Sequence, residues 1–355
     1  MPVVNEEQIL EVLGTIKDGD KDIVSAGMIS GLQIKDGHVA FAIEVDPERG
    51  NQMEPLRKEA EKNVYELDGV LSVTVGLTAE KKNGSHDSET QAQHHPAGTG
   101  PYAIKMPGVK SIVAVASGKG GVGKSTFATN IALALKSLGS KVGILDADIY
   151  GPSLPKMMGL NEKPKSDDGK NLIPIEKFDL QCMSIGFLVD EETPMIWRGP
   201  MVTSAIKTFT QKVLWKDLDF IIVDMPPGTG DTQLTFAQEI KVDGVIIVST
   251  PQEIALLDVK RGIKMFDKLN VPILGLVDNM SFFESEDGEK HNIFGEGGVE
   301  KTAKKYKKKF LGKVPINIDL RIAADTGTPL VEKDPNHKIS KIFKEIAKKV
   351  KESYL

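Results

Sequence analysis

The residues from Gly118 to Ser125 read GKGGVGKS, a glycine-rich run that ends in a lysine and a serine. Glycine lets the backbone bend so that successive N–H groups point inward, and such a loop at the start of a helix attracts phosphate. With this spacing we expect Lys124 to reach the β- and γ-phosphates of a nucleotide, and the Ser125 hydroxyl to bind Mg²⁺. The run therefore predicts a nucleoside triphosphate site. The alternative is a glycine-rich turn that only joins a strand to a helix.

The residues on either side of this run supply the elements that a phosphate loop needs. Residues 112–115 form an apolar run typical of a strand. After the loop, apolar residues recur at helical spacing, at Ile131, Ala132, Leu135 and Leu138. Strand, loop and helix thus follow one another in the order that a phosphate loop requires.

Acidic residues follow two further predicted strands. Asp146 and Asp148 come after the run 142–145, and Asp224 comes after the run 220–223. Ligands of open α/β sheets bind outside the carboxyl ends of the strands, so these carboxylates are expected near the phosphates. We expect Asp224 to hold Mg²⁺ through a metal-bound water and Asp146 to support its loop. The alternative for each aspartate is a helix cap.

From Ser111 onward, strand-like and helix-like segments alternate, which predicts an α/β fold with a parallel sheet covered by helices on both faces. The strand candidates are continuously apolar, as expected for strands buried on both faces. They are Ile112–Ala116, Val142–Leu145, Leu180–Ser184, Phe220–Val223, Val245–Val248 and Ile273–Val277.

Residues 1–80 predict a separate small α/β domain, and the polar residues 81–107, rich in Gly, Ser and Pro, predict a flexible linker to a second domain at 108–355. In the small domain Asn5 is expected to cap a helix, and Asp36-Gly37 to form a hairpin turn. The other predicted elements are strands over Gly27–Ile34, His38–Val45 and Val70–Gly76 and a helix over Gln52–Glu66.

Composition excludes several classes of protein. The 355 residues are 40% hydrophobic and 27% charged with a net charge of -5, which gives no overall attraction to nucleic acid. No apolar run could span a bilayer and the first residues do not form a signal peptide, so we expect a cytoplasmic protein. Cys182 is the only cysteine, which excludes an intrachain disulfide, and we interpret it as a small buried hydrophobe rather than a ligand.

The run KGGVGKS resembles the deviant phosphate loop of the MinD/ParA/nitrogenase-iron-protein class. The resemblance implies that Lys119 reaches across a homodimer to the partner's nucleotide; the alternative is a solvated loop lysine. It also implies that Asp148 orients the attacking water. Asn279 would read the adenine edge, unless it is simply a turn asparagine, and the segment Val314–Asp319 would close over the base.

Six longer motifs resemble the Mrp/ApbC family of ATP-dependent iron–sulfur carrier proteins: GKGGVGKST, LDADIYGPSLPKMMG, WRGPMV, DFIIVDMPPGTGDTQLT, DNMSFF and IFGEGG. The resemblance implies a MinD-like fold of the SIMIBI class. The first domain resembles the SufT/PaaD-like domain of iron–sulfur assembly through DKDIVSAGMI and LDGVLSVTV. Family members hold an iron–sulfur cluster at the dimer interface through a Cys-x-x-Cys pair, whereas this chain has FFESEDGE at residues 282–289. The thiolates that a cluster needs are therefore missing.

Two hypotheses follow. In the first, the chain is an ATP-hydrolysing carrier or scaffold of iron–sulfur assembly that works as a homodimer with cluster clients or scaffold proteins. In the second, it is a MinD/ParA-like dimerisation switch that recruits a protein partner without a cluster. The predicted catalytic residues are Lys119, Lys124 and Asp148; the predicted Mg²⁺ ligands are Ser125 and Asp224. The predicted ATP-binding residues are Gly118, Lys119, Gly120, Gly121, Val122, Gly123, Lys124, Ser125, Thr126, Asn279 and Pro315.

Overall fold

The computed structural model describes residues 4–19, 21–35, 38–45, 53–68, 70, 72–78, 105–166, 168, 170–187, 205–206 and 208–354. The chain divides into two compact units, Met1–Gln91 and Ala92–Leu355. The predicted linker falls almost wholly outside the described residues, so the domain limits at 80 and 107 stay predictions. The motif WRGPMV also lies outside them.

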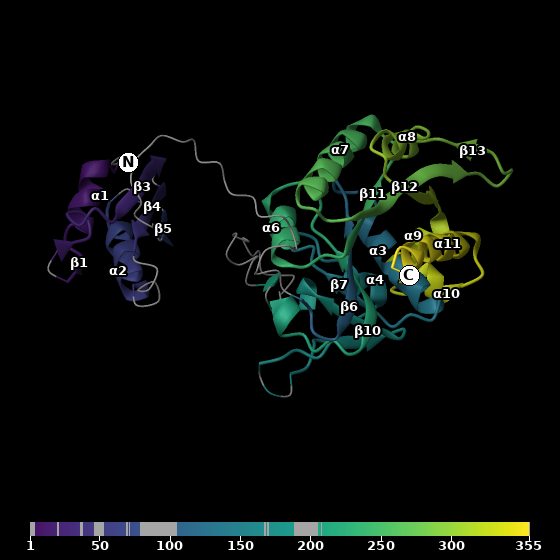
Figure 1. Ribbon diagram of the computed structural model, residues 1–355, viewed down its shortest axis with the longest axis horizontal. Helices are drawn as coiled ribbons and strands as arrows, with labels where there is room; N and C mark the ends of the chain where they lie inside the picture. The colour runs from purple at the N-terminus through teal and green to yellow at the C-terminus, as the bar shows by residue number, and fades with distance from the viewer. Residues whose placement is uncertain are drawn as a thin grey trace. The chain divides into compact units, whose positions relative to one another are not determined.

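The first unit is a small three-stranded sheet packed against two helices (Figure 1). Strand β3 runs antiparallel to β4, and β4 runs parallel to β5. Asn5 caps the first helix as predicted: its side chain accepts a hydrogen bond from the Gln8 N–H, and the Gln8 side chain accepts one from the Asn5 N–H. The Asp36-Gly37 turn lies outside the described residues. The elements are α1 (Glu6–Leu13), β1 (Lys17–Asp18), β2 (Lys21–Asp22), β3 (Ile29–Lys35), β4 (His38–Glu44), α2 (Glu54–Tyr65) and β5 (Ser72–Thr78).

The second unit is built on a nine-stranded, mostly parallel sheet in the order β13-β12-β11-β6-β10-β7-β9-β8, with β14 also paired to β12. Its strands are β6 (Val109–Ala116), β7 (Val142–Asp146), β8 (Ile175–Lys177), β9 (Leu180–Ser184), β10 (Leu218–Asp224), β11 (Gly244–Ser249), β12 (Ile273–Glu284), β13 (Lys290–His291) and β14 (Phe310–Ile316). The central strands are buried almost without interruption, which confirms the predicted parallel sheet covered on both faces.

Helices cover both faces of this sheet, with α6 and α7 on one side and α3 and α11 on the other (Figure 1). Phe127 of α3 packs against Phe343 of α11 with ring centroids 5.7 Å apart. The helices are α3 (Lys124–Ser137), α4 (Leu154–Met158), α6 (Asp231–Glu239), α7 (Glu253–Lys268), α8 (Gly298–Lys305), α9 (Ile318–Asp325), α10 (Leu330–Lys333) and α11 (Lys338–Glu352), with a short 3-10 turn at Ile185–Phe187.

Two predictions at the edge of the sheet were wrong. The sixth strand was expected to end at Val277, but β12 continues to Glu284, because it pairs with β11 at Asp278 and with β13 at Phe283. The segment expected to close over the base as a loop begins as a strand instead. Val314–Ile316 completes β14, which pairs in parallel with β12, and Asn317 then caps α9.

Candidate nucleotide-binding and hydrolysis site

The glycine-rich loop joins β6 to α3 as predicted, and several of its glycines are required by geometry. Gly121 and Gly123 both have φ of 78°, where a side chain would be strained. A Cβ on Gly123 would overlap the side-chain amide of Asn279. A Cβ on Gly118 would lie 2.6 Å from the backbone of Asp258 on α7. The loop is therefore held between β12 and α7, and only glycine fits at these approaches.

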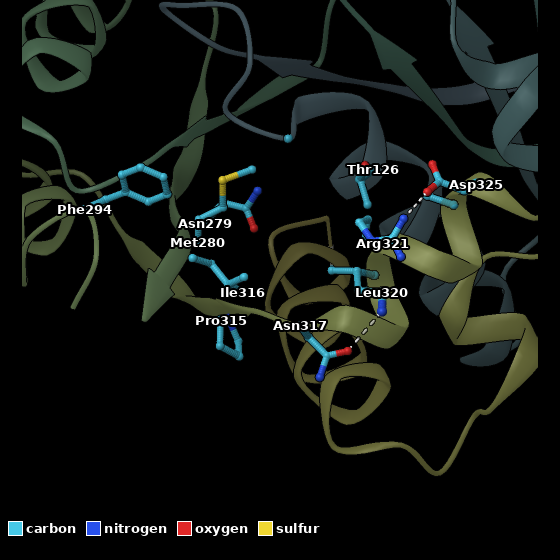
Figure 2. Close-up of a pocket in the computed structure, with 12 residues that line it drawn as sticks. Thr126, Asn279, Met280, Phe294, Pro315, Ile316, Asn317, Leu320, Arg321 and Asp325 are labelled. Atoms are coloured by element: carbon cyan, nitrogen blue, oxygen red, sulfur yellow. Dashed lines mark hydrogen bonds and ion pairs between the residues drawn. The ribbon is translucent and has the colours of Figure 1, made fainter. Parts of the chain in front are cut away.

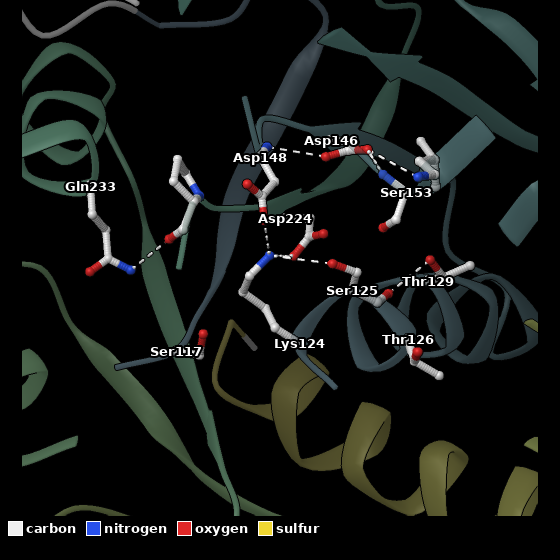
Figure 3. A network of polar contacts seen from close by, with 12 residues as sticks. Ser117, Lys124, Ser125, Thr126, Thr129, Asp146, Asp148, Ser153, Asp224 and Gln233 are labelled. Carbon is white, nitrogen blue, oxygen red and sulfur yellow. Dashed lines mark hydrogen bonds and ion pairs between the residues drawn. The ribbon is translucent and has the colours of Figure 1, made fainter. Parts of the chain in front are cut away.

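Lys124, the first residue of α3, lies between two carboxylates, Asp224 at the end of β10 and Asp148 just after β7. Its Nζ is 2.5 Å from Asp224 Oδ1 and 3.3 Å from Asp148 Oδ2, and all three side chains are at least nine-tenths buried. Burial alone would lower the pKa of Lys124, but Asp224 and Asp148 outweigh it and the net pKa is raised. Burial also raises the pKa of Asp224, against the opposing charge of Lys124. The three residues form one buried charge cluster (Figure 3).

Asp146 supports the segment that carries Asp148, as predicted. Its Oδ2 accepts hydrogen bonds from the Ser153 N–H, the Leu154 N–H and the Ser184 hydroxyl, at 2.9 to 3.0 Å. Its Oδ1 accepts one from the Asp148 N–H at 3.1 Å. Burial, with the charge of Asp224, raises the pKa of Asp146 to about 7. One carboxylate thus fixes both ends of the segment 148–154.

These residues surround a cavity of about 270 Å³ at the glycine-rich loop. Lys119, Lys124, Ser125 and Asp148 all line it, together with Ser153 and Pro227. Lys119 is exposed, and its carbonyl accepts a hydrogen bond from the Ser117 hydroxyl at 2.9 Å. Asp224 lies directly behind, in contact with Lys124. The structure therefore brings the predicted loop residues and the three predicted acidic positions to one place.

A second cavity, of about 450 Å³, shares the lining residues Gly123 and Thr126 with the first, so the two are adjacent. Its wall is largely apolar, with Met280 and Phe294 on one side and Ile316 and Leu320 on another (Figure 2). The predicted residues Asn279 and Pro315 both line it. An apolar cavity beside a phosphate-sized one has the layout of a nucleoside next to its phosphates.

Asn279 has a contact that the sequence did not predict. Its Nδ2 donates a buried hydrogen bond to the Val122 carbonyl at 2.7 Å, so the side chain fastens the glycine-rich loop to β12. The amide nitrogen has a second hydrogen, and the oxygen is an acceptor, so a contact to a base in the cavity is compatible with this bond. The side chain that supports the loop therefore also has a donor and an acceptor available for a base in the cavity.

Several lining residues were missed by the sequence analysis. Arg321 and Asp325 form an ion pair of 2.6 Å on α9 at the apolar cavity, and only their spacing of four on a helix could have linked them. Phe294 and Ser153 stand in the motifs IFGEGG and YGPS, which were recognised without a role for either residue. Their positions depend on loops whose path the sequence does not reveal.

The donor set fits a magnesium nucleotide. Mg²⁺ in such sites is held by one or two protein oxygens and by substrate phosphates rather than by a complete protein cage. Ser125 and Asp224 supply two such oxygens beside the loop. In the part of the chain that the structure describes, the buried Oδ1 of Asp148 has no hydrogen-bond partner, which leaves it free for a ligand or water.

The donor set does not fit an iron–sulfur cluster. Cys182, the only cysteine of the chain, is fully buried in β9, and burial raises the pKa of its thiol to about 12. The described residues contain no group of three or more His, Cys, Asp or Glu side chains that could hold a metal ion. The predicted burial of Cys182 is confirmed.

None of the helices described has the length and the apolar character needed to cross a bilayer. The apolar side of the lysine-rich α11 packs into the core, where Phe343, Ile346 and Val350 are buried. Its lysines mainly contact the protein itself; Lys349 and Lys351 donate to the Leu311 and Leu138 carbonyls.

Comparisons with known proteins match both units. Residues 108–351 match the ParA family model, described as NUBPL iron-transfer P-loop NTPase, and residues 6–75 match a model described as iron-sulfur cluster assembly protein. The chain is 53% identical over 245 residues to the "Iron-sulfur cluster carrier protein" of Escherichia coli K12, which covers 68% of this chain and 66% of that relative. The protein of the same name from Synechocystis is 40% identical, over 98% of this chain and 97% of its own length.

Solved structures agree on the fold. A nucleotide-binding protein from Archaeoglobus fulgidus, solved in complex with ADP, is 40% identical with a TM-score of 0.55 and covers 62% of this chain and 87% of its own. The cell division ATPase MinD of Pyrococcus furiosus has a TM-score of 0.52 at 20% identity, over 68% of this chain and 99% of its own. The predicted MinD-like fold is thus confirmed.

Proposed function

The chain belongs to the family of NUBPL iron-transfer P-loop NTPases, and we propose that it is a magnesium-dependent ATPase that works as a homodimer in iron–sulfur cluster assembly. The observation that best supports ATP hydrolysis is the position of Lys124. Its ammonium group lies 2.5 Å from Asp224 and 3.3 Å from Asp148, at the cavity where the phosphates of a nucleotide would lie. A buried cation between carboxylates is poised to exchange them for phosphate oxygens when a nucleotide enters.

Each residue of the cluster then has a distinct part in the reaction. Ser125 and Asp224 would hold Mg²⁺, which when bound neutralises charge on the phosphates. Lys124 would turn from Asp224 to the β- and γ-phosphates. The unpartnered Oδ1 of Asp148 would accept a hydrogen bond from the attacking water and orient it. Asp146 keeps Asp148 in place through the hydrogen bond from the Asp148 N–H.

The homodimer is supported by the surface beside the loop. Lys119 is exposed at the cavity. Helix α7, which closely approaches Gly118, exposes 58% of Ile254 and 53% of Leu257, an apolar pair that a second copy would cover. We propose that Lys119 of each copy contacts the nucleotide of the other, so that ATP lies between the subunits and hydrolysis is linked to their separation.

The role in iron–sulfur assembly rests on the two family matches and on the carrier relatives. Because Cys182 is buried and no second cysteine exists, we propose that the thiolates come from a client or scaffold protein. The ATP cycle would then act on a partner that holds the cluster itself. We place this activity in the cytoplasm.

The lack of thiolates favours a second candidate as well, a dimerisation switch in which the ATP-bound dimer recruits a protein that carries no cluster. The two candidates differ in what the captured partner contains. Iron and acid-labile sulfide in proteins captured anaerobically by the ATP-bound chain would favour the first, and partners without either would favour the second.

The experiment that tests the proposal combines hydrolysis with anaerobic reconstitution of the full chain. We expect phosphate release from ATP that requires Mg²⁺ and stops in EDTA. After incubation with iron and sulfide and removal of small molecules, wild type and Cys182→Ala should both lack a bound cluster by iron quantitation and absorption. Failure to bind ATP would refute the ATPase, and a cluster retained by the chain alone would refute the use of a partner's thiolates.

A further inference from the structure

Ser153 is the N-cap residue of α4, but its side chain does not serve as a cap. An N-cap serine ordinarily accepts a hydrogen bond from a backbone N–H of the first helical turn. Here the Ser153 side chain makes no cap bond, and the Asp146 carboxylate accepts from the Ser153 N–H and the Leu154 N–H. Capping therefore does not explain a serine at this position.

The hydroxyl left over is buried and has no hydrogen-bond partner among the residues that the structure describes. Leaving a buried hydroxyl unsatisfied costs free energy that a well-packed alanine would avoid. Of the few other unpartnered buried side-chain atoms described, the Oδ1 of Asp148 lies on the same short segment. Asp146 fixes both residues, through the Asp148 N–H and the Ser153 N–H.

Both unpartnered atoms belong to residues that line the phosphate cavity. Figure 3 shows the Ser153 hydroxyl on the side of the residue that faces away from Asp146, toward Ser125. Two unsatisfied polar atoms on a segment that one buried carboxylate holds in place form a preorganised binding site for a polar ligand. The ligand that this cavity suits is the phosphate group of a magnesium nucleotide.

We propose that Ser153 is a nucleotide-contacting residue, whose hydroxyl donates a hydrogen bond to an oxygen of the bound magnesium nucleotide. That oxygen belongs either to a phosphate or to a water of the metal. The inference rests on the proposed function, which supplies the nucleotide. It adds a residue from the segment after β7 to the residues of the glycine-rich loop. It also gives the serine of YGPS a chemical role.

The test measures nucleotide affinity rather than turnover, using displacement of a fluorescent ATP analogue from the full chain. Ser153→Ala should bind ATP with Mg²⁺ about tenfold more weakly than wild type, the size expected for loss of one hydrogen bond to a charged group. Ser153→Thr keeps the hydroxyl and should bind within about threefold of wild type. The same titrations in EDTA separate the two acceptors. Weakening that persists without metal assigns a phosphate oxygen, and weakening confined to Mg²⁺ assigns a metal-bound water.

Ser184→Ala serves as the control, because the Ser184 hydroxyl donates to Asp146 from β9 and does not line the cavity, whereas Ser153→Ala keeps the backbone N–H that donates to Asp146. If the loss of ATP affinity came only from disturbance of Asp146, Ser184→Ala, which removes a hydrogen bond to Asp146, should weaken ATP binding at least as much as Ser153→Ala, and the inference fails. Wild-type affinity in Ser153→Ala overturns it too. Melting curves without nucleotide check that each variant folds, and Ser153→Thr keeps the inference testable if the alanine variant does not. Wild type that binds no nucleotide refutes the proposed function itself, a result distinct from these.

Discussion

Replacing Lys124 by methionine should destabilise the nucleotide-free protein as well as abolish nucleotide binding. Methionine keeps most of the length of the side chain and removes its charge and its N–H donors. In the structure this charge lies 2.5 Å from Asp224 and 3.3 Å from Asp148, with Asp146 close behind. It is the cation that compensates this group of buried carboxylates, so its loss leaves them without a counter-charge.

The magnitude follows from the burial of the cluster. Removing one partner of a buried ion pair costs about 3–5 kcal/mol, because the remaining charge stays desolvated. For a domain of this size each kcal/mol lowers Tm by roughly 2–4 °C, so we expect a fall of roughly 10 °C at pH 8. Without the lysine the pKa of Asp224, which burial raises and Lys124 lowers, rises further, and protonation then removes its buried charge. The loss of stability should therefore be smaller at pH 6 than at pH 8.

Urea unfolding followed by tryptophan fluorescence is the assay, since both tryptophans, Trp197 and Trp215, belong to the second unit. Asp224→Asn and the double variant complete a cycle that isolates the pair. We expect a coupling energy of about 2 kcal/mol between Lys124 and Asp224, measured in EDTA without nucleotide. A Lys124→Met protein as stable as wild type at pH 8, with a coupling near zero, would show that the lysine does not compensate these carboxylates.

Three further predictions concern the surface, the sheet edge and the base cavity. Lys119→Ala should bind ATP as a monomer but fail to dimerise with it, and unchanged dimerisation in sizing experiments would contradict contact across the subunits. Burial raises the pKa of Asp278 to about 6, and neither of its oxygens has a partner among the described residues. A raised carboxyl pKa means that the folded state holds the proton more tightly, so stability should fall as pH rises from about 4 to 6. Asp278→Asn should flatten this fall and raise Tm at pH 8. Asn279→Ala should weaken ATP binding about tenfold.

Most of the fold could be predicted because the central strands are recognisable from their own apolar sequences. The six runs expected as strands all lie in strands, since most of them are continuously apolar and bounded by turn residues or helices. The elements that were missed are short or edge elements such as β8 and β13, whose residues are largely polar. Their hydrogen bonds come from neighbouring strands, so the local sequence contains little sign of them.

The candidate site was predictable to the extent that its residues stand next to one another in sequence. The loop and Lys124 follow from a single motif, and Asp224 follows from the end of a buried strand. The hydrogen bonds of Asp146 join residues from two strands and a helix start, and no spacing predicts them. Ser153 illustrates the limit: its motif was recognised, but the missing cap bond that frees its hydroxyl appears only in three dimensions.

Asn279 was correctly predicted to line the site, but only one of its two roles was predicted. The two roles can be separated by experiment. From the sequence we expected Asn279 to follow the end of a strand and to contact the adenine. In the structure it lies inside β12, where its Nδ2 donates a hydrogen bond to the Val122 carbonyl at 2.7 Å. A residue that only reads the base matters for ATP and not for inorganic triphosphate, which has no base. A residue that supports the loop matters for both. We therefore expect Asn279→Ala to weaken binding of magnesium triphosphate as well as ATP, with the larger loss for ATP. Unchanged triphosphate binding would show that the hydrogen bond to Val122 does not shape the phosphate site.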